Sequence, residues 1–206
     1  MVEVFCSVSG VFIENTYFLI DETELVGAIV DPGLGALDNL KRLSQKEIAW
    51  KSIFLTHAHF DHLMGLSEIK AFTNATIYLH KEDLFLYNSF PEEAKKFGYS
   101  VAPLPKPEIL WNDGDKAYLG TTEFEVIHTP GHTPGGVCLK WSDGLMTGDT
   151  LMHLQIGRTD WFGSFEQIQH SISEKLYTLP DHLTIYPGHH QQSTIGIEKE
   201  LNQEVY

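Results

Sequence analysis

The segment that most constrains this chain is a histidine-rich stretch, residues 56–62, which has the sequence Thr-His-Ala-His-Phe-Asp-His. Three imidazoles and one carboxylate lie within six positions, in a chain that has only 11 histidines among 206 residues. The largely apolar residues 52–55 before it predict a short buried strand, and Leu63, Leu66 and Ile69 after it recur at helical spacing. The histidines are therefore expected where a strand turns into a helix, and ligand sites of α/β sheets gather at such strand ends.

The spacing within this stretch predicts two metal sites. Side chains alternate along an extended segment, so His57 and His59 point to the same side and can hold one ion. Asp61 and His62 follow the change of direction into the helix, so they are expected to face a second ion. Neutral imidazole and carboxylate are ligands of Zn²⁺, and also of Fe²⁺ or Mn²⁺. The alternative is a hydrophilic turn that happens to be rich in histidine, which is disfavoured because turns prefer Gly, Asn, Asp and Ser.

Three further polar residues share one sequence context, since each follows an apolar strand and lies beside glycine or proline. They are His132, Asp149 and His189. Strand ends converge in space, so these side chains are expected to join the histidine-rich stretch. The predicted first ion takes His57, His59 and His132, and the second takes Asp61, His62 and His189. Asp149 is predicted to bridge both ions, because a carboxylate offers two oxygens.

Hydrophobic periodicity predicts two successive groups of strands, each followed by helices. The expected strands are residues 2–8 and 11–20 as a hairpin, then 25–30, 52–55, 75–80, 123–127, 137–141, 145–147 and 183–186. The expected helices are residues 36–48, 81–87 and 165–179. Residues 88–107 contain four prolines and predict a long loop, either a lid or a tolerated surface insertion. This order of elements predicts two sheets packed as a sandwich and covered by helices.

Composition narrows the class of protein. A length of 206 residues, with 42% hydrophobic and 20% charged residues, suits one globular domain over residues 1–206. The net charge of −14 argues against nucleic acid or an anionic membrane as the main partner. Cys6 and Cys138 are the only cysteines and make no disulfide framework. No signal peptide or membrane-spanning run is evident, so a cytoplasmic protein is expected.

Four motifs together resemble a known family. They are THAHFDH at 56–62, TPGHT at 129–133, GDT at 148–150 and YPGH at 186–189. The set resembles the metallo-β-lactamase-fold hydrolases and, within them, the glyoxalase II (hydroxyacylglutathione hydrolase) group. The resemblance implies an α+β fold, a four-layer αββα sandwich, with a binuclear metal site at one edge of the sheets. It also implies the ligand roles assigned above and two divalent ions, with zinc preferred over iron or manganese.

The resemblance extends to residues that would support the ligands, but it does not extend to the family's C-terminal domain. Asp31, in the turn Asp31-Pro32-Gly33, is expected to orient a ligand histidine, and His128 is a second candidate for such a supporting role. The chain ends soon after His189, so it is expected to be a short form without the helical C-terminal domain that carries much of the glutathione-binding surface in the family.

The expected activity is thioester hydrolysis of the hydroxyacylglutathione type. A water between two cations loses its proton near neutral pH and attacks the carbonyl, with Asp61 and Asp149 as catalytic residues that orient it. The leaving thiolate has a conjugate-acid pKa of about 8.5, so it departs without a strong general acid. Arg158 is expected to bind a carboxylate of a small anionic thioester, or else to form a structural ion pair with Asp160.

Three other functions fit the same residues. His57, His132 and Asp149 alone would form a two-histidine, one-carboxylate site for iron, as in persulfide dioxygenases of this fold. Lactone hydrolysis could use the same two metals. A metal-binding module that acts only through a partner is the least favoured, and cleavage of RNA is disfavoured by the charge of −14.

Overall fold

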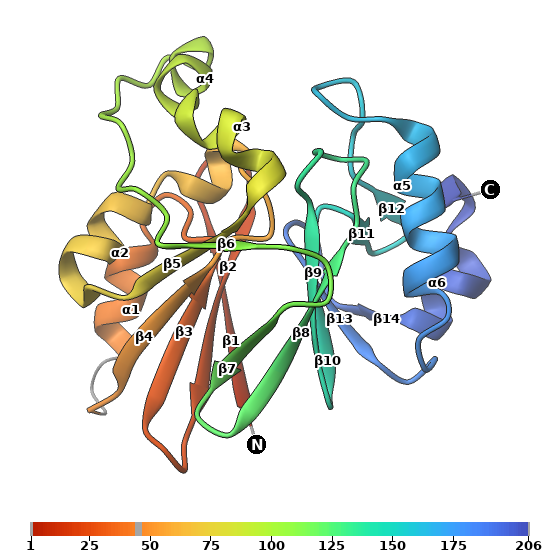
Figure 1. Ribbon diagram of the computed structural model, residues 1–206, viewed down its shortest axis with the longest axis horizontal. Helices are drawn as coiled ribbons and strands as arrows, with labels where there is room; N and C mark the ends of the chain where they lie inside the picture. The colour runs from red at the N-terminus through yellow and green to blue at the C-terminus, as the bar shows by residue number, and fades with distance from the viewer. Residues whose placement is uncertain (1, 44–46, 206) are drawn as a thin grey trace.

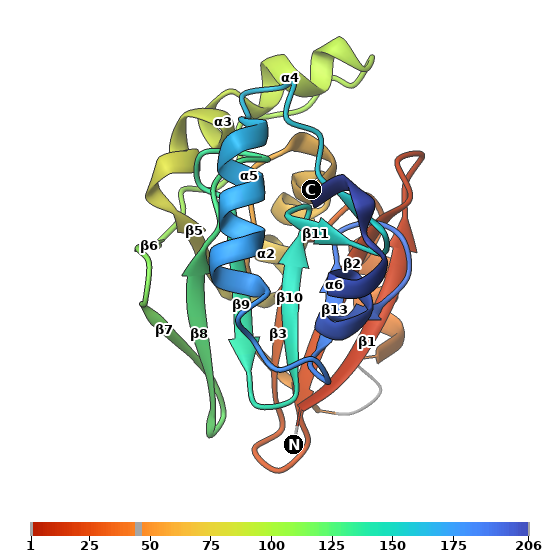
Figure 2. The ribbon, with the colours of Figure 1, turned by 90° about the vertical axis from the view of Figure 1, so that its right-hand side faces the viewer.

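Two six-stranded β-sheets face one another in the computed structural model, which describes residues 2–43 and 47–205. Figure 1 shows the helices α1 and α2 on the outer side of the first sheet, and α5 and α6 on the outer side of the second. Figure 2 shows α5 and α6 lying over the strands of the second sheet. The expected four-layer αββα sandwich is therefore confirmed.

The first sheet comes from the N-terminal half of the chain. Its strands lie in sequence order, β1 (Val2–Ser9), β2 (Glu14–Asp21), β3 (Val26–Val30), β4 (Ala49–Phe54), β5 (Thr76–His80) and β6 (Ile109–Trp111). The first three strands pair antiparallel, which confirms the expected hairpin, and β3 to β6 pair parallel. Every residue of β2 is buried, as suits a strand that is covered on both faces.

The second sheet comes from the C-terminal half. Across the sheet its strands are β14 (Ser193–Thr194), β13 (Thr184–Pro187), β10 (Gly144–Gly148), β9 (Val137–Trp141), β8 (Thr122–His128) and β7 (Lys116–Leu119). Only the pair of β10 and β13 is parallel among these described strands. A separate small hairpin joins β11 (Leu151–Met152) to β12 (Gln155–Ile156).

The helices occupy the outer layers and the upper edge in Figure 1. On the first sheet are α1 (Ala36–Leu43), the 3₁₀ turn η1 (Phe60–Leu63), α2 (Leu66–Thr73), η2 (Lys81–Asp83), α3 (Leu84–Asn88) and α4 (Phe90–Lys96). On the second are α5 (Phe165–Ser171), its π-helical continuation η3 (Ile172–Leu176), α6 (Ile195–Leu201) and η4 (Gln203–Val205). Within the described residues, no helix is long and apolar enough to cross a membrane.

Two sequence-based expectations about helices need correction. The helix expected over 36–48 ends at Leu43, residues 47–48 are not helical, and residues 44–46 lie outside the described residues. The loop expected over 88–107 contains α4. Pro91 lies in the first turn of α4, where a missing N–H costs no helical hydrogen bond, so this proline starts a helix and does not prevent one. Residues 97–108 do remain without helix or strand.

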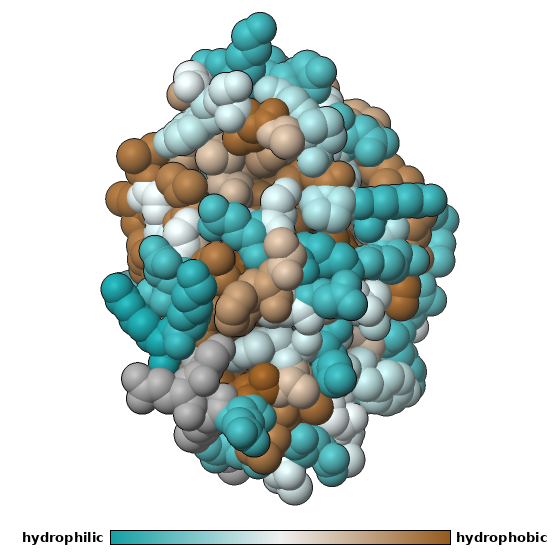
Figure 3. Space-filling model, turned by 90° about the vertical axis from the view of Figure 1, so that its left-hand side faces the viewer, coloured by the Kyte–Doolittle hydropathy of each residue, from teal (hydrophilic) through white to brown (hydrophobic). Residues whose placement is uncertain are grey.

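One of three buried hydrophobic clusters lies between the two sheets and fixes their relative position. Phe54 of β4 contacts Trp111 of the same sheet at a ring-centroid distance of 5.5 Å, and its contact with Phe124 of β8 at 6.0 Å joins the two sheets directly. Further buried clusters lie under α1 and α2 and under α5. On the outer face seen in Figure 3, hydrophilic side chains are interspersed with hydrophobic ones. The packed core holds the ends of β4, β8, β10 and β13 at one edge of the sandwich.

Candidate metal centre

All seven predicted ligands lie together at this edge, although they come from four separate segments of the chain. The loop after β4 and the following turn η1 supply four of them, and single residues follow β8, β10 and β13. In chain order they are His57, His59, Asp61, His62, His132, Asp149 and His189. Each sits where a buried strand ends, which is why the sequence context identified them.

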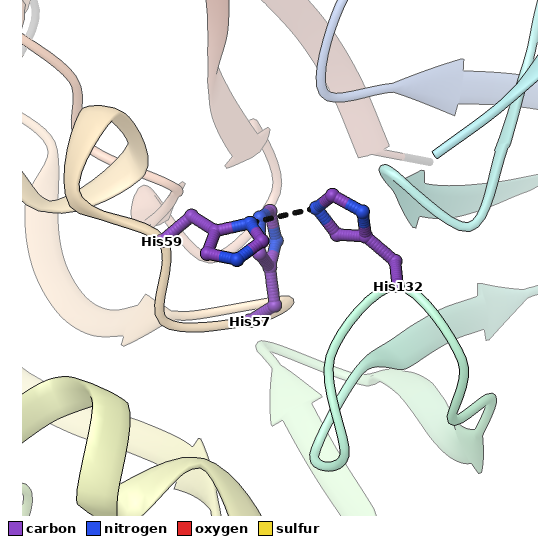
Figure 4. Close-up of side chains that lie close together, drawn as sticks. All are labelled: His57, His59 and His132. Carbon is purple, nitrogen blue, oxygen red and sulfur yellow. Dashed lines mark hydrogen bonds between the residues drawn. The ribbon is translucent and has the colours of Figure 1, made fainter. Parts of the chain in front are cut away.

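The first group unites two segments that are far apart in the sequence. The donor nitrogens of His57, His59 and His132 all lie within 4.8 Å of one another. Figure 4 shows His57 and His59 on one loop and His132 reaching toward them from another, with 2.8 Å between His59 Nδ1 and His132 Nε2. One ion could contact all three nitrogens.

The second group lies beside the first. Donor atoms of Asp61, His62 and His189 also lie within 4.8 Å of one another, and the Nε2 atoms of the two histidines are 3.3 Å apart. Asp149 faces both groups. Its Oδ2 is 3.4 Å from His132 Nε2 and 3.6 Å from His189 Nε2, and its Oδ1 is 3.6 Å from His62 Nε2. This position is the one that a bridging carboxylate requires.

A hydrogen-bond chain from Asp31 orients two of the histidines. The hydroxyl of Thr56 donates its single proton to Asp31 Oδ2 at 2.6 Å, and the same oxygen atom of Thr56 lies 3.0 Å from His57 Nδ1. His57 Nδ1 must therefore donate to Thr56, which leaves a free lone pair on its Nε2. His62 Nδ1 lies 3.2 Å from the same Asp31 oxygen. Asp31 thus contacts His62 directly and reaches His57 through Thr56, an intermediary that the sequence did not indicate.

Backbone carbonyls orient two further predicted ligands, His132 and His189. His132 Nδ1 donates to the carbonyl of Arg158 at 2.7 Å, and His189 Nδ1 donates to the carbonyl of Ile13 at 3.2 Å. Hydrogen bonds of this kind fix both the tautomer and the ring orientation of a metal-binding histidine. The rings of both histidines therefore turn Nε2 toward the centre.

The donor set fits divalent metal ions. Nε2 of His57 and Oδ1 of Asp149 are buried, and within the described part of the chain they have no hydrogen-bond partner. Buried polar atoms are rarely left without partners, because their desolvation is then uncompensated. A bound cation would satisfy both atoms. Imidazole nitrogens with carboxylate oxygens suit zinc and iron.

The electrostatics of the site keep His57 and His59 neutral and favour a proton on His62. Burial, followed by repulsion from His62, holds the pKa of His57 well below its usual value, and burial with neighbouring imidazole lowers the pKa of His59 to about 3. Burial also opposes charge on His62, but the carboxylates of Asp149 and Asp61 outweigh it and raise the pKa of His62 well above the usual value. A divalent cation would take the place of that proton among the carboxylates.

Asp83 is a buried carboxylate that the sequence reasoning missed. It accepts hydrogen bonds from Ala58 N at 2.9 Å, Thr133 Oγ1 at 2.8 Å and Gly135 N at 2.6 Å. Burial raises its pKa to about 6. Asp83 therefore ties the loop that carries His57 and His59 to the loop after β8. Its place just after β5 is the same strand-end signal that identified the ligands.

His128 lies outside the two ligand groups. Its Nε2 is 2.8 Å from the carbonyl oxygen of Pro134, and its ring stacks on His80 with centroids 4.1 Å apart and planes inclined by 20°. With Glu82 these two histidines have donor atoms within 4.8 Å of one another. The in-plane lone pairs of stacked rings run nearly parallel and do not converge on one ion, so this geometry does not favour a third metal site.

A cavity of about 340 Å³ opens beside the metal centre. Arg158 lines it, and its guanidinium forms a two-point ion pair with Asp160, with Nε–Oδ1 and Nη2–Oδ2 distances of 3.0 and 2.6 Å. The Arg158 side chain is 82% exposed. Its position agrees with both sequence-based alternatives, the substrate contact and the ion pair.

Known proteins confirm the fold family. The family model described as the Metallo-beta-lactamase superfamily matches residues 9–189. The chain belongs to the metallo-beta-lactamase superfamily. Within this superfamily it is 36% identical over 189 residues to the hydroxyacylglutathione hydrolase GloC of Haemophilus influenzae, an alignment that covers 89% of each chain.

Two solved structures extend the superfamily comparison. The B3 metallo-beta-lactamase BLEG-1 has a TM-score of 0.91 and 28% identity, covering 98% of this chain and 99% of that one. TTHA1623, solved in a di-iron-bound form, has a TM-score of 0.87 and 28% identity, covering 97% and 99%. The names of these superfamily members refer to different activities and metals. The reaction of this chain therefore has to be argued from its own site.

Proposed function

We propose that this protein hydrolyses thioesters of the hydroxyacylglutathione type at a centre of two divalent metal ions. The observation that carries the proposal is the position of Asp149, whose two oxygens lie 3.4 to 3.6 Å from histidines of both ligand groups. The similarity to GloC, a hydrolase named for this substrate class, supports the reaction type.

Each ion would be held by one of the two groups, and Asp149 would bridge the two ions. His57, His59 and His132 would hold the first, and Asp61, His62 and His189 the second. Such ions, when bound, lower the pKa of a water molecule to near neutrality and polarise a carbonyl. Zinc is the preferred ion for this donor set, and the di-iron form of TTHA1623 makes iron the alternative.

The carboxylates of the chain would orient the attacking water. Burial opposes ionisation of Asp61, but His62 and the hydrogen bond to His189 lower its pKa below the usual value. The same kind of balance holds the pKa of Asp149 well below its usual value. Both groups are thus ionised at neutral pH and can accept hydrogen bonds from water. The departing thiolate needs no strong acid, since its conjugate acid has a pKa of about 8.5.

Two measurements on one preparation test this proposal. Elemental analysis gives the metal content per chain, and S-lactoylglutathione hydrolysis gives the activity. Close to two ions per chain with hydrolysis is the expected result. Two ions with no hydrolysis would contradict the thioesterase, and a chromogenic cephalosporin would then test the β-lactamase activity that the name of BLEG-1 carries.

A mononuclear iron dioxygenase is the second candidate. His57, His132 and Asp149 offer two histidines and one carboxylate, and His132 Nε2 lies 3.4 Å from Asp149 Oδ2, which suits ligands of one iron ion. One iron per chain, with oxygen uptake in the presence of glutathione persulfide and no thioester hydrolysis, would favour this function.

A further inference from the structure

Four aromatic side chains pack together along one side of the cavity, and we name this cluster the aromatic wall. Its members come from four different segments: Phe12, Phe60, Phe97 and Trp161. Phe60 and Phe97 stack with centroids 4.4 Å apart, and Phe12 meets both edge-on at 5.0 and 5.3 Å. Trp161 continues the surface at 5.6 Å from Phe97.

The aromatic wall begins at the metal centre itself. Trp161 stacks on the predicted ligand His59, with centroids 5.5 Å apart and planes inclined by 29°. Phe97 lies farther along the wall and is 42% exposed while it lines the cavity. A group attached to a carbonyl at the centre would therefore lie against Trp161 and could cover Phe97. Covering exposed aromatic surface removes it from water and stabilises the complex.

The remaining lining has a different character. Beyond the ligand residues it is formed by the β11–β12 segment and its continuation, with Met152, Gln155, Ile156, Gly157 and Arg158, and by His190. Among the described lining residues, Arg158 carries the one guanidinium or ammonium group, and Asp160 already pairs with it. On this side of the cavity, the guanidinium of Arg158 can bind one substrate carboxylate in place of Asp160.

We propose that the aromatic wall is the acyl subsite of the enzyme, and that its substrates are thioesters whose acyl group carries an aromatic or similarly large apolar substituent. The thiol part is directed to the side of Arg158, where the guanidinium can contact one of its carboxylates. This inference rests on the proposed thioesterase function and narrows its substrate class. The small acyl group of a lactoyl thioester leaves most of the wall uncovered, and a ring-bearing acyl group covers it.

Two matched substrates test the subsite in the metal-loaded enzyme. S-mandeloylglutathione differs from S-lactoylglutathione only by a phenyl group in place of the methyl group of the acyl part. The expected kcat/KM is about tenfold or more higher for the mandeloyl substrate, because apolar groups in a fitting pocket contribute on that scale. Trp161→Ala is expected to remove most of this preference without changing the metal content, and Trp161→Phe to retain most of it.

Phe72→Ala is the matched control, because Phe72 is an exposed aromatic residue at the end of α2 that does not line the cavity. Its preference ratio is expected to equal that of the wild type. Equal kcat/KM for the two substrates in the wild type, or an unchanged ratio in Trp161→Ala, would overturn the acyl subsite.

A binding measurement separates this inference from the proposed reaction. The product acids mandelate and lactate are titrated calorimetrically into the zinc-loaded protein, with no turnover required. Tighter binding of mandelate that is lost in Trp161→Ala supports the subsite, even if neither thioester is hydrolysed and the thioesterase proposal fails. Equal binding of the two acids overturns the subsite, even if both thioesters are hydrolysed.

Discussion

Asp149 is the single residue on which the two-ion proposal depends most. The other six predicted ligands divide into two groups of three, and the two oxygens of Asp149 lie 3.4 to 3.6 Å from histidines of both groups. Its carboxylate is buried, and Oδ1 has no hydrogen-bond partner in the described part of the chain. A carboxylate in this position is costly to bury unless a cation compensates its charge.

Asp149→Ala is therefore expected to lose metal and nearly all hydrolytic activity. Elemental analysis and thioester hydrolysis on the same sample measure both effects. Asp143→Ala, in the exposed turn before β10, is the control and should keep metal and activity. Turnover near the wild-type rate with both ions retained would disprove the bridging role.

Arg158 acts on substrate affinity in the proposed reaction, since it lines the cavity but contacts the centre only through its backbone carbonyl. Arg158→Ala is expected to raise KM for an anionic thioester several-fold, with little change in metal content, because an exposed charged contact contributes modestly. Steady-state kinetics measure KM and kcat separately. An unchanged KM would assign the guanidinium only to its ion pair with Asp160.

At the scale of elements, the sequence predicted the parts whose signals are local. Buried strands that end at glycine, proline and histidine are visible in the sequence, so β4, β8, β10 and β13 and their polar ends were expected together. The strands β6 and β7 have only three and four residues and were missed, because short strands at sheet edges carry little periodicity.

The role of Asp83 was missed because its partners lie 25 to 52 residues away.

Asp83 joins two loops, so its substitution tests how elements position the centre. In Asp83→Asn one oxygen acceptor becomes an amino group that faces a donor, which should loosen the loops that carry His57, His59 and His132. We expect zinc affinity and kcat to fall about tenfold, with the metal effect measured by chelator competition. Glu82→Gln, an exposed neighbour of similar charge change, is the control. Wild-type zinc affinity in Asp83→Asn would show that the loops hold their positions without this carboxylate.

At the scale of the whole molecule, metal binding and folding should be coupled. A ligand that binds only the folded chain stabilises it, by about 4 kcal/mol when its free concentration is 1,000 times Kd. Removal of metal by a chelator is therefore expected to lower the thermal midpoint. A single transition is also expected, if residues 1–206 fold as one domain. Calorimetry with and without zinc tests both, and an unchanged midpoint would mean that the ions contribute no stability.

The pH dependence of metal binding follows from the charge arrangement. The pKa of His62 is raised by Asp149 and Asp61, so at neutral pH a proton occupies the place that a cation must take. Metal binding should release protons, and zinc affinity should therefore fall as the pH is lowered from about 8 to about 6. Competition titrations across this range measure the effect. An affinity that does not change with pH would contradict the proton competition.

The ligands divide between the two halves of the chain in a way that affects assembly. His57, His59, Asp61 and His62 follow strands of the first sheet, whereas His132, Asp149 and His189 follow strands of the second. Neither half contains a full group for either ion, so each ion would serve as a removable cross-link between them. In a chain cut between β6 and β7, the two fragments would share the hydrophobic residues between the sheets, and metal would strengthen their association.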